Sequence, residues 1–522
     1  MRRAAVLEES KRGSLGIGLG ETSAHPARAM PRYDLAVIGG GIMGLSHAAA
    51  ALARGLSVAL FERGPAVTEA SVRNFGLLTS LYDGGGQWGD RALRSRELYR
   101  AWSARGGCPL SHCGSLQLAQ TPLQWALLQA YAAAAPRLRY PVALLDARAA
   151  RARLPALQRH PSVLGALHFP EDALLEPRVM FDREGGLPAA LARAGLALHW
   201  ATPIVALRRS EGSGGDGGSE AAHVELRSAS GQAFTARRAV LCAGADVHAL
   251  APALFASEAP RLRLCKLQMM RLLLEAPEGG GLADGGGSAG GGAALPPPCT
   301  VTSGLSLRRY PGPAAVCPAE HAALLAGEQA SAAAQALGIH VIARPAAALP
   351  RTAFDAVDAG AAAAAAAAAP LQLSQREWIV GDSHEYWPLA RGSAAPAHDE
   401  SCSEAVTDEI LKVTAGMLQG VEGLLQARGA AGSAGSAGSS SDARAPRWRA
   451  RLLQQWSGTY LDHAEGFFSA AASIRGGEVA RLPEAQAAAR RGGTVHIATG
   501  IGGKGMTMSP ALGEEFVARY YP

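Results

Sequence analysis

Residues 34–62 read DLAVIGGGIMGLSHAAAALARGLSVALFE, an order that predicts a strand, a glycine turn, a helix, a second strand and an acidic end. Gly39 permits a tight turn, Gly41 lets the backbone approach a pyrophosphate, and Gly44 lets the helix pack closely on the strand. Glu62 can accept hydrogen bonds from ribose hydroxyls. This stretch therefore predicts a dinucleotide site that favours FAD or NAD over NADP, whose 2′-phosphate prefers an arginine.

Composition and charge narrow the class of protein. The chain has 522 residues, more than one hydrophobic core usually serves, so two domains are expected. Its net charge of +6 comes from 50 basic and 44 acidic residues without a basic block, which argues against nucleic-acid binding. The seven cysteines form no C-x-x-C pair, so neither a disulfide framework nor a zinc site is expected. No apolar stretch is long enough to span a membrane.

Residues 1–30 precede the first predicted strand and are basic but not poor in acidic residues. We read them as a disordered leader, with Met30 as the start of the functional fold. A cytoplasmic location is the first expectation, and mitochondrial or plastid targeting by residues 1–30 remains the alternative.

The rest of the chain alternates strand-like and helical blocks, a pattern that predicts a mixed α/β fold. The strands expected to extend the first parallel sheet come late, at 239–243 and 495–498, so the cofactor domain is expected to be discontinuous. Residues 204–208 and 223–227 predict an antiparallel hairpin. Three low-complexity stretches, 279–294, 346–370 and 429–441, have too few large apolar side chains to build a core and read as insertions.

A second glycine-rich motif, GIGGKGMT at 500–507, follows a strand and precedes a helix. Free N–H groups and the positive end of a helix dipole suit the negative charge that a reduced flavin develops, and Lys504 can add to it. Read more plainly, this is a glycine loop with a solvated lysine. The small-residue turn 243–245 also ends a strand, at the edge where open α/β sheets bind ligands.

Four residues outside these motifs are candidates for catalysis or substrate binding: Lys266, Arg309, Tyr310 and His384. A compact ammonium at Lys266 can polarise oxygen or a substrate group near a flavin, although an ordinary strand lysine is equally consistent. Arg309 and Tyr310 can clamp an anionic group, and strand alternation allows only one of Arg308 and Arg309 to face it. His384 can equally be a hydrogen-bonded loop residue.

Taken together, the opening motif, SVRNFG at 71–76, CAGAD at 242–246 and the motif at 500–507 resemble the D-amino-acid oxidase superfamily of FAD-dependent amine oxidoreductases. CKLQMMR at 265–271 and GDSHEY at 381–386 resemble more narrowly a branch associated with aminophosphonate breakdown. The resemblance implies FAD rather than NAD, bound by a GR2-type Rossmann domain, and a discontinuous, mainly antiparallel substrate domain. The implied FAD-binding domain comprises 33–114, 175–260 and 485–522, and the substrate domain comprises 115–174 and 261–484.

The resemblance also implies a reaction. A small anionic amine gives hydride from its α-carbon to flavin N5, and O2 or another acceptor reoxidises the flavin. The substrate implied for the branch is an N-alkylated 2-aminoethylphosphonate, and oxidation of glycine- or sarcosine-type amino acids is the alternative. The residues expected to contact the cofactor are Gly39, Gly41, Gly44, Glu62, Arg63, Ser71, Arg73, Asn74, Gly76, Val205, Gly244, Gly500, Gly505, Met506 and Thr507.

Two other functions stay open at this point. The opening motif alone permits an NAD-dependent dehydrogenase, against which the second glycine motif argues. A flavin-binding scaffold without catalysis is also compatible, because a fold does not guarantee activity.

Overall fold

The computed structural model describes residues 32–79, 86–153, 163–210, 222–275, 299–347, 373–389, 401–418, 421–429, 449–475, 478–490 and 492–522. The expected leader 1–30 lies outside these ranges, as does the tip of the expected hairpin. The insertions expected at 279–294, 346–370 and 429–441 also fall outside them, apart from residues 346, 347 and 429. The described chain forms two nine-stranded sheets and a small three-stranded one, which confirms the predicted mixed α/β fold.

The first sheet contains the dinucleotide motif. Its strand order is β20-β19-β21-β12-β1-β2-β9, with β10 and β11 attached beside β12. The bounds are β1 Arg32–Ile38, β2 Val58–Phe61, β9 Ala197–His199, β10 Ile204–Ser210, β11 His223–Ser228, β12 Ala233–Leu241, β19 Phe468–Arg475, β20 Glu478–Arg481 and β21 Thr494–Thr499. β1 pairs in parallel with β2 and β12, and β12 pairs in parallel with β21, so the late parallel strands are confirmed. The predicted hairpin is confirmed by the antiparallel pairing of β10 and β11.

The strand pairing of residues 468–481 differs from the domain bounds expected from the sequence. Residues 468–481 were assigned to the substrate domain, yet β19 pairs antiparallel with β21 in the first sheet and β20 pairs with β19. The alternation of apolar and polar residues along these strands does not reveal which sheet they join, because both sheets contain antiparallel strands.

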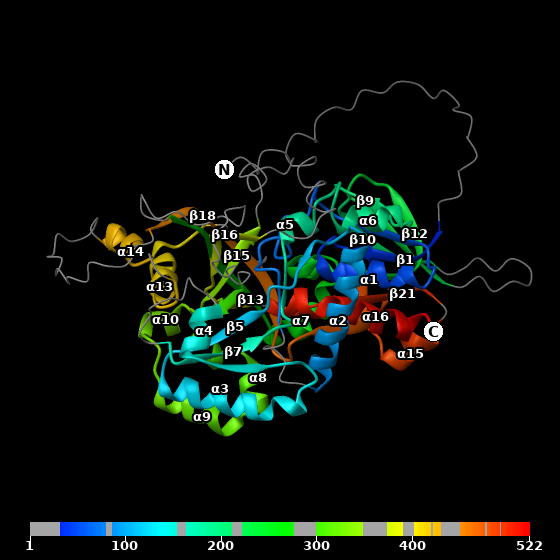
Figure 1. Cartoon of the computed structure of the whole chain (residues 1–522). Helices are drawn as coiled ribbons and strands as arrows, with labels where there is room; N and C mark the ends of the chain where they lie inside the picture. The colour runs from blue at the N-terminus through cyan, green and yellow to red at the C-terminus, as the bar shows by residue number, and fades with distance from the viewer. Residues whose placement is uncertain are drawn as a thin grey trace, which may run out of the picture. The chain divides into compact units, whose positions relative to one another are not determined.

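Two helices pack side by side on the first sheet, and a third packs against one of them. α1, Ile42–Ala53, contacts α16, Gly505–Tyr520, and α16 contacts α2, Gly86–Ala104 (Figure 1). α1 is rich in alanine, and a Cβ added at Gly513 would lie 2.6 Å from the Ser46 carbonyl oxygen, so small residues set this close approach. The C-terminal helix thereby holds the helix that follows the dinucleotide turn.

The second sheet has the order β17-β13-β16-β15-β14-β5-β7-β6, and β18 also pairs with β13. It is mainly antiparallel, as expected for the substrate part, with one parallel pair between β5 and β14. The bounds are β5 Ser115–Ala119, β6 Ala143–Asp146, β7 Gly165–Phe169, β13 Leu262–Glu275, β14 Thr300–Thr302, β15 Ile342–Ala347, β16 Leu373–Gly381, β17 Glu385–Pro388 and β18 Arg449–His463.

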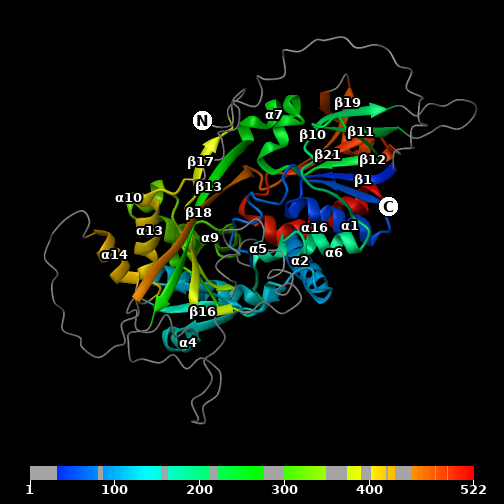
Figure 2. The same cartoon turned by 90° about the horizontal axis from the view of Figure 1, so that it is seen from above.

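The long strands β13 and β18 connect the two halves of the core. They pair along their length from Leu262 with His463 to Glu275 with Arg449, and both run out of the second sheet toward the first (Figure 2). Leu264 packs with the core of the first sheet, whereas Leu272 packs with a core of the second. The cavity described below lies at the end of this strand pair.

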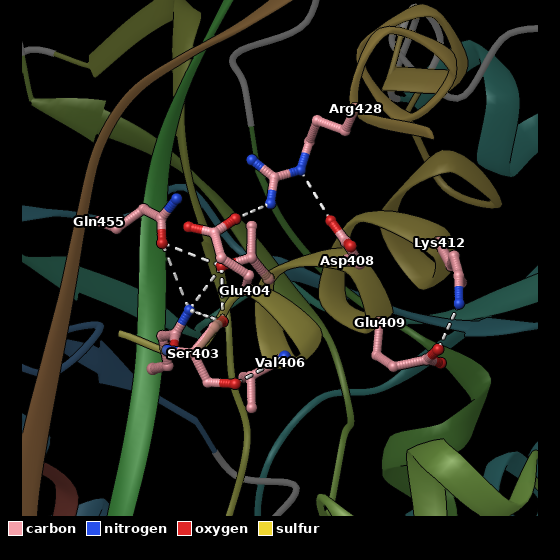
Figure 3. Close-up of polar contacts among 10 residues, drawn as sticks. Ser403, Glu404, Val406, Asp408, Glu409, Lys412, Arg428 and Gln455 are labelled. Atoms are coloured by element: carbon pink, nitrogen blue, oxygen red, sulfur yellow. Dashed lines mark hydrogen bonds and ion pairs between the residues drawn. The ribbon is translucent and has the colours of Figure 1, made fainter. Parts of the chain in front are cut away.

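Polar contacts cap one helix and join it to a second helix at a distance from the cavity. The Ser403 hydroxyl caps α13, Glu404–Ala415, by accepting from the Val406 amide at 3.4 Å. Arg428 of α14, Val421–Gly429, pairs with Asp408 at 2.7 Å and with Glu404 (Figure 3). The two ion pairs connect α13 with α14.

The remaining strands and helices cover the sheets or connect them. The small sheet contains β3 Leu77–Leu78, β4 Leu110–Ser111 and β8 Ala173–Leu175. The other helices are α3 Pro122–Ala134, α4 Ala147–Arg153, α5 Pro177–Met180, α6 Leu187–Arg193, α7 Pro252–Glu258, α8 Pro311–Val316, α9 Pro318–Gly327, α10 Ala332–Ala336 and α15 Glu484–Ala489. Among the residues that the structure describes, no helix combines the length and apolar character needed to cross a membrane.

Candidate active site

The turn between β1 and α1 requires its glycines. Gly39 has φ +109°, and a Cβ there would lie 2.4 Å from the Cys242 carbonyl oxygen. A Cβ at Gly44 would lie 1.9 Å from the Gly39 carbonyl oxygen, so helix and strand pack as the motif predicts. A Cβ at Gly41 would lie 2.9 Å from the Ser71 hydroxyl. The turn therefore leaves its backbone open to a phosphate group.

Glu62 lies at the carboxyl end of β2 and closes this turn. Its carboxylate accepts from the amides of Gly40 at 2.8 Å and Gly64 at 2.9 Å, which holds it beside the glycines. The neighbouring Arg63 pairs with Glu69 at 3.0 Å and Asp246 at 2.6 Å. Because two carboxylates already hold this guanidinium, the local chemistry suits a free ribose hydroxyl better than a 2′-phosphate.

The segment 71–76 forms a second wall through its own hydrogen bonds. The Ser71 hydroxyl accepts from the Ile42 amide at 3.0 Å, and Asn74 accepts from the Gly76 amide at 2.7 Å. The Arg73 guanidinium donates to the carbonyls of Thr68 and Ser457, at 2.7 and 3.0 Å. Arg73 thus ties this segment to β18.

The second glycine motif brings a helix terminus to the same place. Gly500 and Gly502 have φ +69° and +60°, a conformation that residues with side chains rarely adopt. The chain then turns into α16, whose first residues Gly505 and Met506 face the cavity. Free N–H groups at this helix start create a positive potential there.

These four segments line one cavity of about 960 Å³, at the upper end of the range of roughly 300–1,000 Å³ for small-molecule and cofactor sites. One end is formed by the two glycine motifs and Glu62. The other end is formed by side chains from the second sheet and its connections, namely Arg263, Leu267, Arg309, Tyr310, His340, Asp382, His384, Tyr386 and Tyr460. The two glycine motifs and these side chains of the second sheet thus line the same cavity.

The guanidinium of Arg309 lies at the end of the cavity that the second sheet forms. Arg309 donates to the Tyr386 hydroxyl at 2.6 Å and to the Gly338 carbonyl at 3.5 Å. Within the described part of the chain, no carboxylate lies within ion-pair distance of Arg309, whereas Arg263 pairs with Asp462 at 2.7 Å. Burial raises the pKa of Tyr386 to about 12, so its phenol keeps a proton that it can donate.

Three titratable groups lie in the wall beside Arg309. His340 Nε2 is 3.0 Å from Asp382 Oδ1, and His384 Nδ1 is 3.6 Å from the same oxygen. Burial lowers the pKa of His384 well below its ordinary value, so this imidazole is neutral at physiological pH. Burial acts to raise the pKa of Asp382, but the nearby His384, His340 and Arg309 outweigh it and lower the pKa.

A comparison with models of known protein families found one match. Residues 34–293 match the family model described as DAO, FAD dependent oxidoreductase. The chain belongs to this family. The expected cofactor is therefore FAD, and the two glycine motifs, Glu62 and the start of α16 are the features of this DAO-family chain that fit it.

Solved structures show the same fold. Glycine oxidase from Geobacillus kaustophilus is 18% identical, with a TM-score of 0.55 over 93% of this chain and 94% of that chain. Iminodiacetate oxidase from Chelativorans sp. BNC1 is 14% identical, with a TM-score of 0.52 over 93% and 94%. L-alpha-glycerophosphate oxidase from Mycoplasma pneumoniae, with FAD bound, is 12% identical, with a TM-score of 0.54 over 94% and 95%. None of the curated protein sequences matches this chain.

Most of the residues selected from the sequence line the cavity of this DAO-family chain. They are Gly39, Gly41, Glu62, Arg63, Ser71, Arg73, Asn74, Gly76, Gly244, Arg309, Tyr310, His384, Gly500, Gly505 and Met506. Gly44 lies behind the turn and acts through packing. The expectation that Arg308 and Arg309 lie on a strand is wrong, because a 3-10 helix, Gly304–Arg308, ends there, and Arg308 donates to the Leu324 and Glu328 carbonyls.

Besides Gly44, three expected site residues lie outside the cavity lining. Lys266 lies on the opposite face of β13 from Leu267, with its Nζ 3.5 Å from the Ser401 hydroxyl. Val205 is 55% exposed, and its neighbour Ile204 lines the cavity instead. The Thr507 hydroxyl donates to the Leu77 carbonyl at 3.4 Å, and Met506 precedes it in the wall. Lys266 and Val205 lie on strands, where neighbouring residues point to opposite faces of the sheet, so an error of one residue places the wrong side chain in the cavity.

Five polar residues at the end of the cavity formed by the second sheet were not expected from the sequence: Arg263, His340, Asp382, Tyr386 and Tyr460. Asp382 and Tyr386 stand in the GDSHEY motif beside the chosen His384, so the motif itself was the available signal. His340 and Tyr460 enter the site only through pairing of distant strands, which no local pattern reports.

Proposed function

We propose that this protein oxidises the C–N bond of a small amine that carries an anionic group, with an N-alkylated 2-aminoethylphosphonate as its substrate. The observation that supports this most is Arg309, a cation in the cavity wall whose guanidinium has no carboxylate partner among the described residues. A planar guanidinium binds a carboxylate or phosphonate through two parallel hydrogen bonds. An anion is therefore the natural occupant beside Arg309.

Arg309 and Tyr386 bind the substrate anion together. Arg309 holds the anion, and the neutral phenol of Tyr386 accepts from Arg309 and can donate its proton to the same anion. FAD, when bound, supplies the two-electron acceptor. Fixing the anion at one point orients the α-carbon of the amine, and orientation of this kind accounts for a large part of catalysis when no covalent step on the protein is needed.

A phosphonate is preferred over a carboxylate because the motifs at 265–271 and 381–386 resemble the aminophosphonate branch. The second of these motifs contributes Asp382, His384 and Tyr386 to the cavity wall. The alternative is oxidation of a glycine- or sarcosine-type amino acid, and the names of two similar structures, a glycine oxidase and an iminodiacetate oxidase, speak for it.

Anaerobic reduction tests the proposal directly. The purified protein is mixed with N-methyl-2-aminoethylphosphonate, sarcosine or glycine, and loss of flavin absorbance is followed. We expect the phosphonate to bleach the flavin fastest, and preferential bleaching by sarcosine or glycine would select the alternative. Bound flavin that none of the three reduces would contradict C–N oxidation of such amines. Admitting O2 after bleaching then distinguishes an oxidase, which reoxidises rapidly, from a dehydrogenase.

A further inference from the structure

We propose that His340, Asp382 and His384 form a binding site for a divalent transition-metal ion in the cavity wall. All three line the cavity, and one ligand atom from each lies within 4.8 Å of the other two. Two imidazoles and one carboxylate are a ligand set that suits Zn²⁺ or Fe²⁺. The expectation of no metal rested on spacing along the chain, whereas these residues come together through strand pairing.

The distances already approach those of a metal site. His340 Nε2 and His384 Nδ1 lie 3.0 and 3.6 Å from Asp382 Oδ1. With bonds of about 2.1 Å and tetrahedral angles, two ligands of one zinc ion are about 3.4 Å apart. Because all three ligand atoms lie within 4.8 Å of one another, we expect rotations of the rings and the carboxylate to bring them onto one ion.

The same three atoms lack other partners. Within the described residues, His340 Nε2, Asp382 Oδ1 and His384 Nδ1 are buried and have no hydrogen-bond partner beyond their contacts with one another. A buried polar atom that lacks a partner destabilises the folded state. Three such atoms that converge on one point are explained by a ligand at that point.

The surroundings hold the ligands in place. The other ring nitrogen of His340, Nδ1, lies 3.2 Å from the Ser306 hydroxyl, as in the supporting contacts that orient metal-bound imidazoles. Amide hydrogen bonds run in both directions between His340 and Asp382, at 2.9 and 3.2 Å, and the His384 amide donates to the Leu337 carbonyl at 3.1 Å. The backbone thus fixes all three positions before an ion arrives.

Charge and accessibility define the kind of site. One carboxylate and two imidazoles supply an oxygen and two nitrogen ligands from one part of the cavity wall. Three protein ligands leave at least one coordination position for water or an anion, and that position faces the cavity. The positive charge of Arg309 acts on Asp382 and His384 and would repel a metal cation between them. We therefore expect this site to bind zinc more weakly than a closed structural zinc site does.

Zinc content and binding test the proposal on the untagged, FAD-loaded protein. We expect one Zn²⁺ per chain by elemental analysis after equilibration and dialysis, and a single site by calorimetry. Asp382→Asn and His384→Asn should each weaken binding at least tenfold. His223→Asn is the matched control, because His223 lies 4.0 Å from the Glu225 carboxylate but outside this cluster, and it should leave binding unchanged.

Three results would overturn the site. The first is absence of stoichiometric zinc in wild-type protein with a normal flavin spectrum. The second is zinc binding that both cluster variants retain. The third is X-ray absorption showing sulfur ligands at about 2.3 Å instead of nitrogen and oxygen ligands at about 2.0–2.2 Å. The flavin spectrum reports folding of each variant, and none of these readouts depends on turnover of an amine.

Discussion

At the scale of single residues, Arg309 is the most direct test of substrate binding. Replacing it by alanine removes a charged partner of the anion, an interaction of about 1.5–3 kcal/mol, so KM for an anionic amine should rise about 10- to 100-fold with a smaller change in kcat. Steady-state kinetics of the variant measures both constants. Arg308→Ala is the control, because Arg308 donates to backbone carbonyls outside the cavity. An unchanged KM in Arg309→Ala protein with full flavin content would refute the anion clamp.

Two buried histidines predict how stability depends on pH. Burial lowers the pKa of His47 to about 4 and that of His496 to about 3, from about 6.5 in the unfolded chain. Between those values the unfolded chain binds protons that the folded chain does not. The free energy of unfolding therefore falls as pH drops below about 6.5, by up to ~1.4 kcal/mol per pH unit for each group.

Melting temperatures measured between pH 7.5 and 4.5 test this dependence. We expect a steady decrease on acidification and a shallower one in the His47→Gln variant, which lacks one of the two groups. The variant loses the contact between His47 Nδ1 and the Met43 carbonyl at 2.7 Å, so its melting temperature at pH 7.5 should be lower as well. An acid dependence as steep as that of the wild type would show that His47 does not contribute.

At the scale of elements, the close packing of α1 on β1 depends on the absence of a side chain at Gly44. In Gly44→Ala the new Cβ meets the Gly39 carbonyl oxygen at 1.9 Å, so α1 must move away from β1 and the turn must open. We expect loss of most bound FAD and a destabilisation of several kcal/mol, in the range of severe core overpacking. Flavin content per chain and the melting temperature measure the two effects.

Gly423→Ala provides the matched control for that substitution. Gly423 lies inside α14, and a Cβ there meets no described atom within 4 Å. Alanine should stabilise this helix by up to ~1 kcal/mol and leave flavin content unchanged. If Gly44→Ala kept its flavin as well, the close approach of helix and strand would not be needed for the site.

The same elements show what the sequence could and could not predict. β21 extends only one residue at each end beyond the expected range 495–498, because a short apolar run ended by turn residues defines it locally. The cofactor half of the cavity followed from glycine spacing, since the chemistry of a phosphate turn is local. The substrate half is built by the pairing of β13, β16, β17 and β18, whose partners lie far apart in the chain. Register across such pairs decides that Leu267 and not Lys266 faces the cavity.

At the scale of the whole molecule, the cavity joins two sheets that share no strand. Its wall takes the β1–α1 turn and residues 500–506 from the first sheet, and residues 458–463 and Tyr386 from the strands of the second. A ligand that contacts both parts favours the folded state of both. At a concentration 100 times its dissociation constant, such a ligand adds about 2.7 kcal/mol to the free energy of unfolding.

Removal of FAD should therefore loosen both sheets where they meet, although the glycine motifs belong to one of them. Hydrogen–deuterium exchange of the protein with and without FAD tests this. Loss of cofactor should increase exchange at residues 39–44 and 500–506 and also at 458–463, while β6, at the far edge of the second sheet, stays unchanged. Adding FAD back should restore protection in all three segments. Protection limited to 39–44 and 500–506 would mean that the cofactor occupies only the first half of the cavity, and Arg309 would then lie too far from it to position an amine.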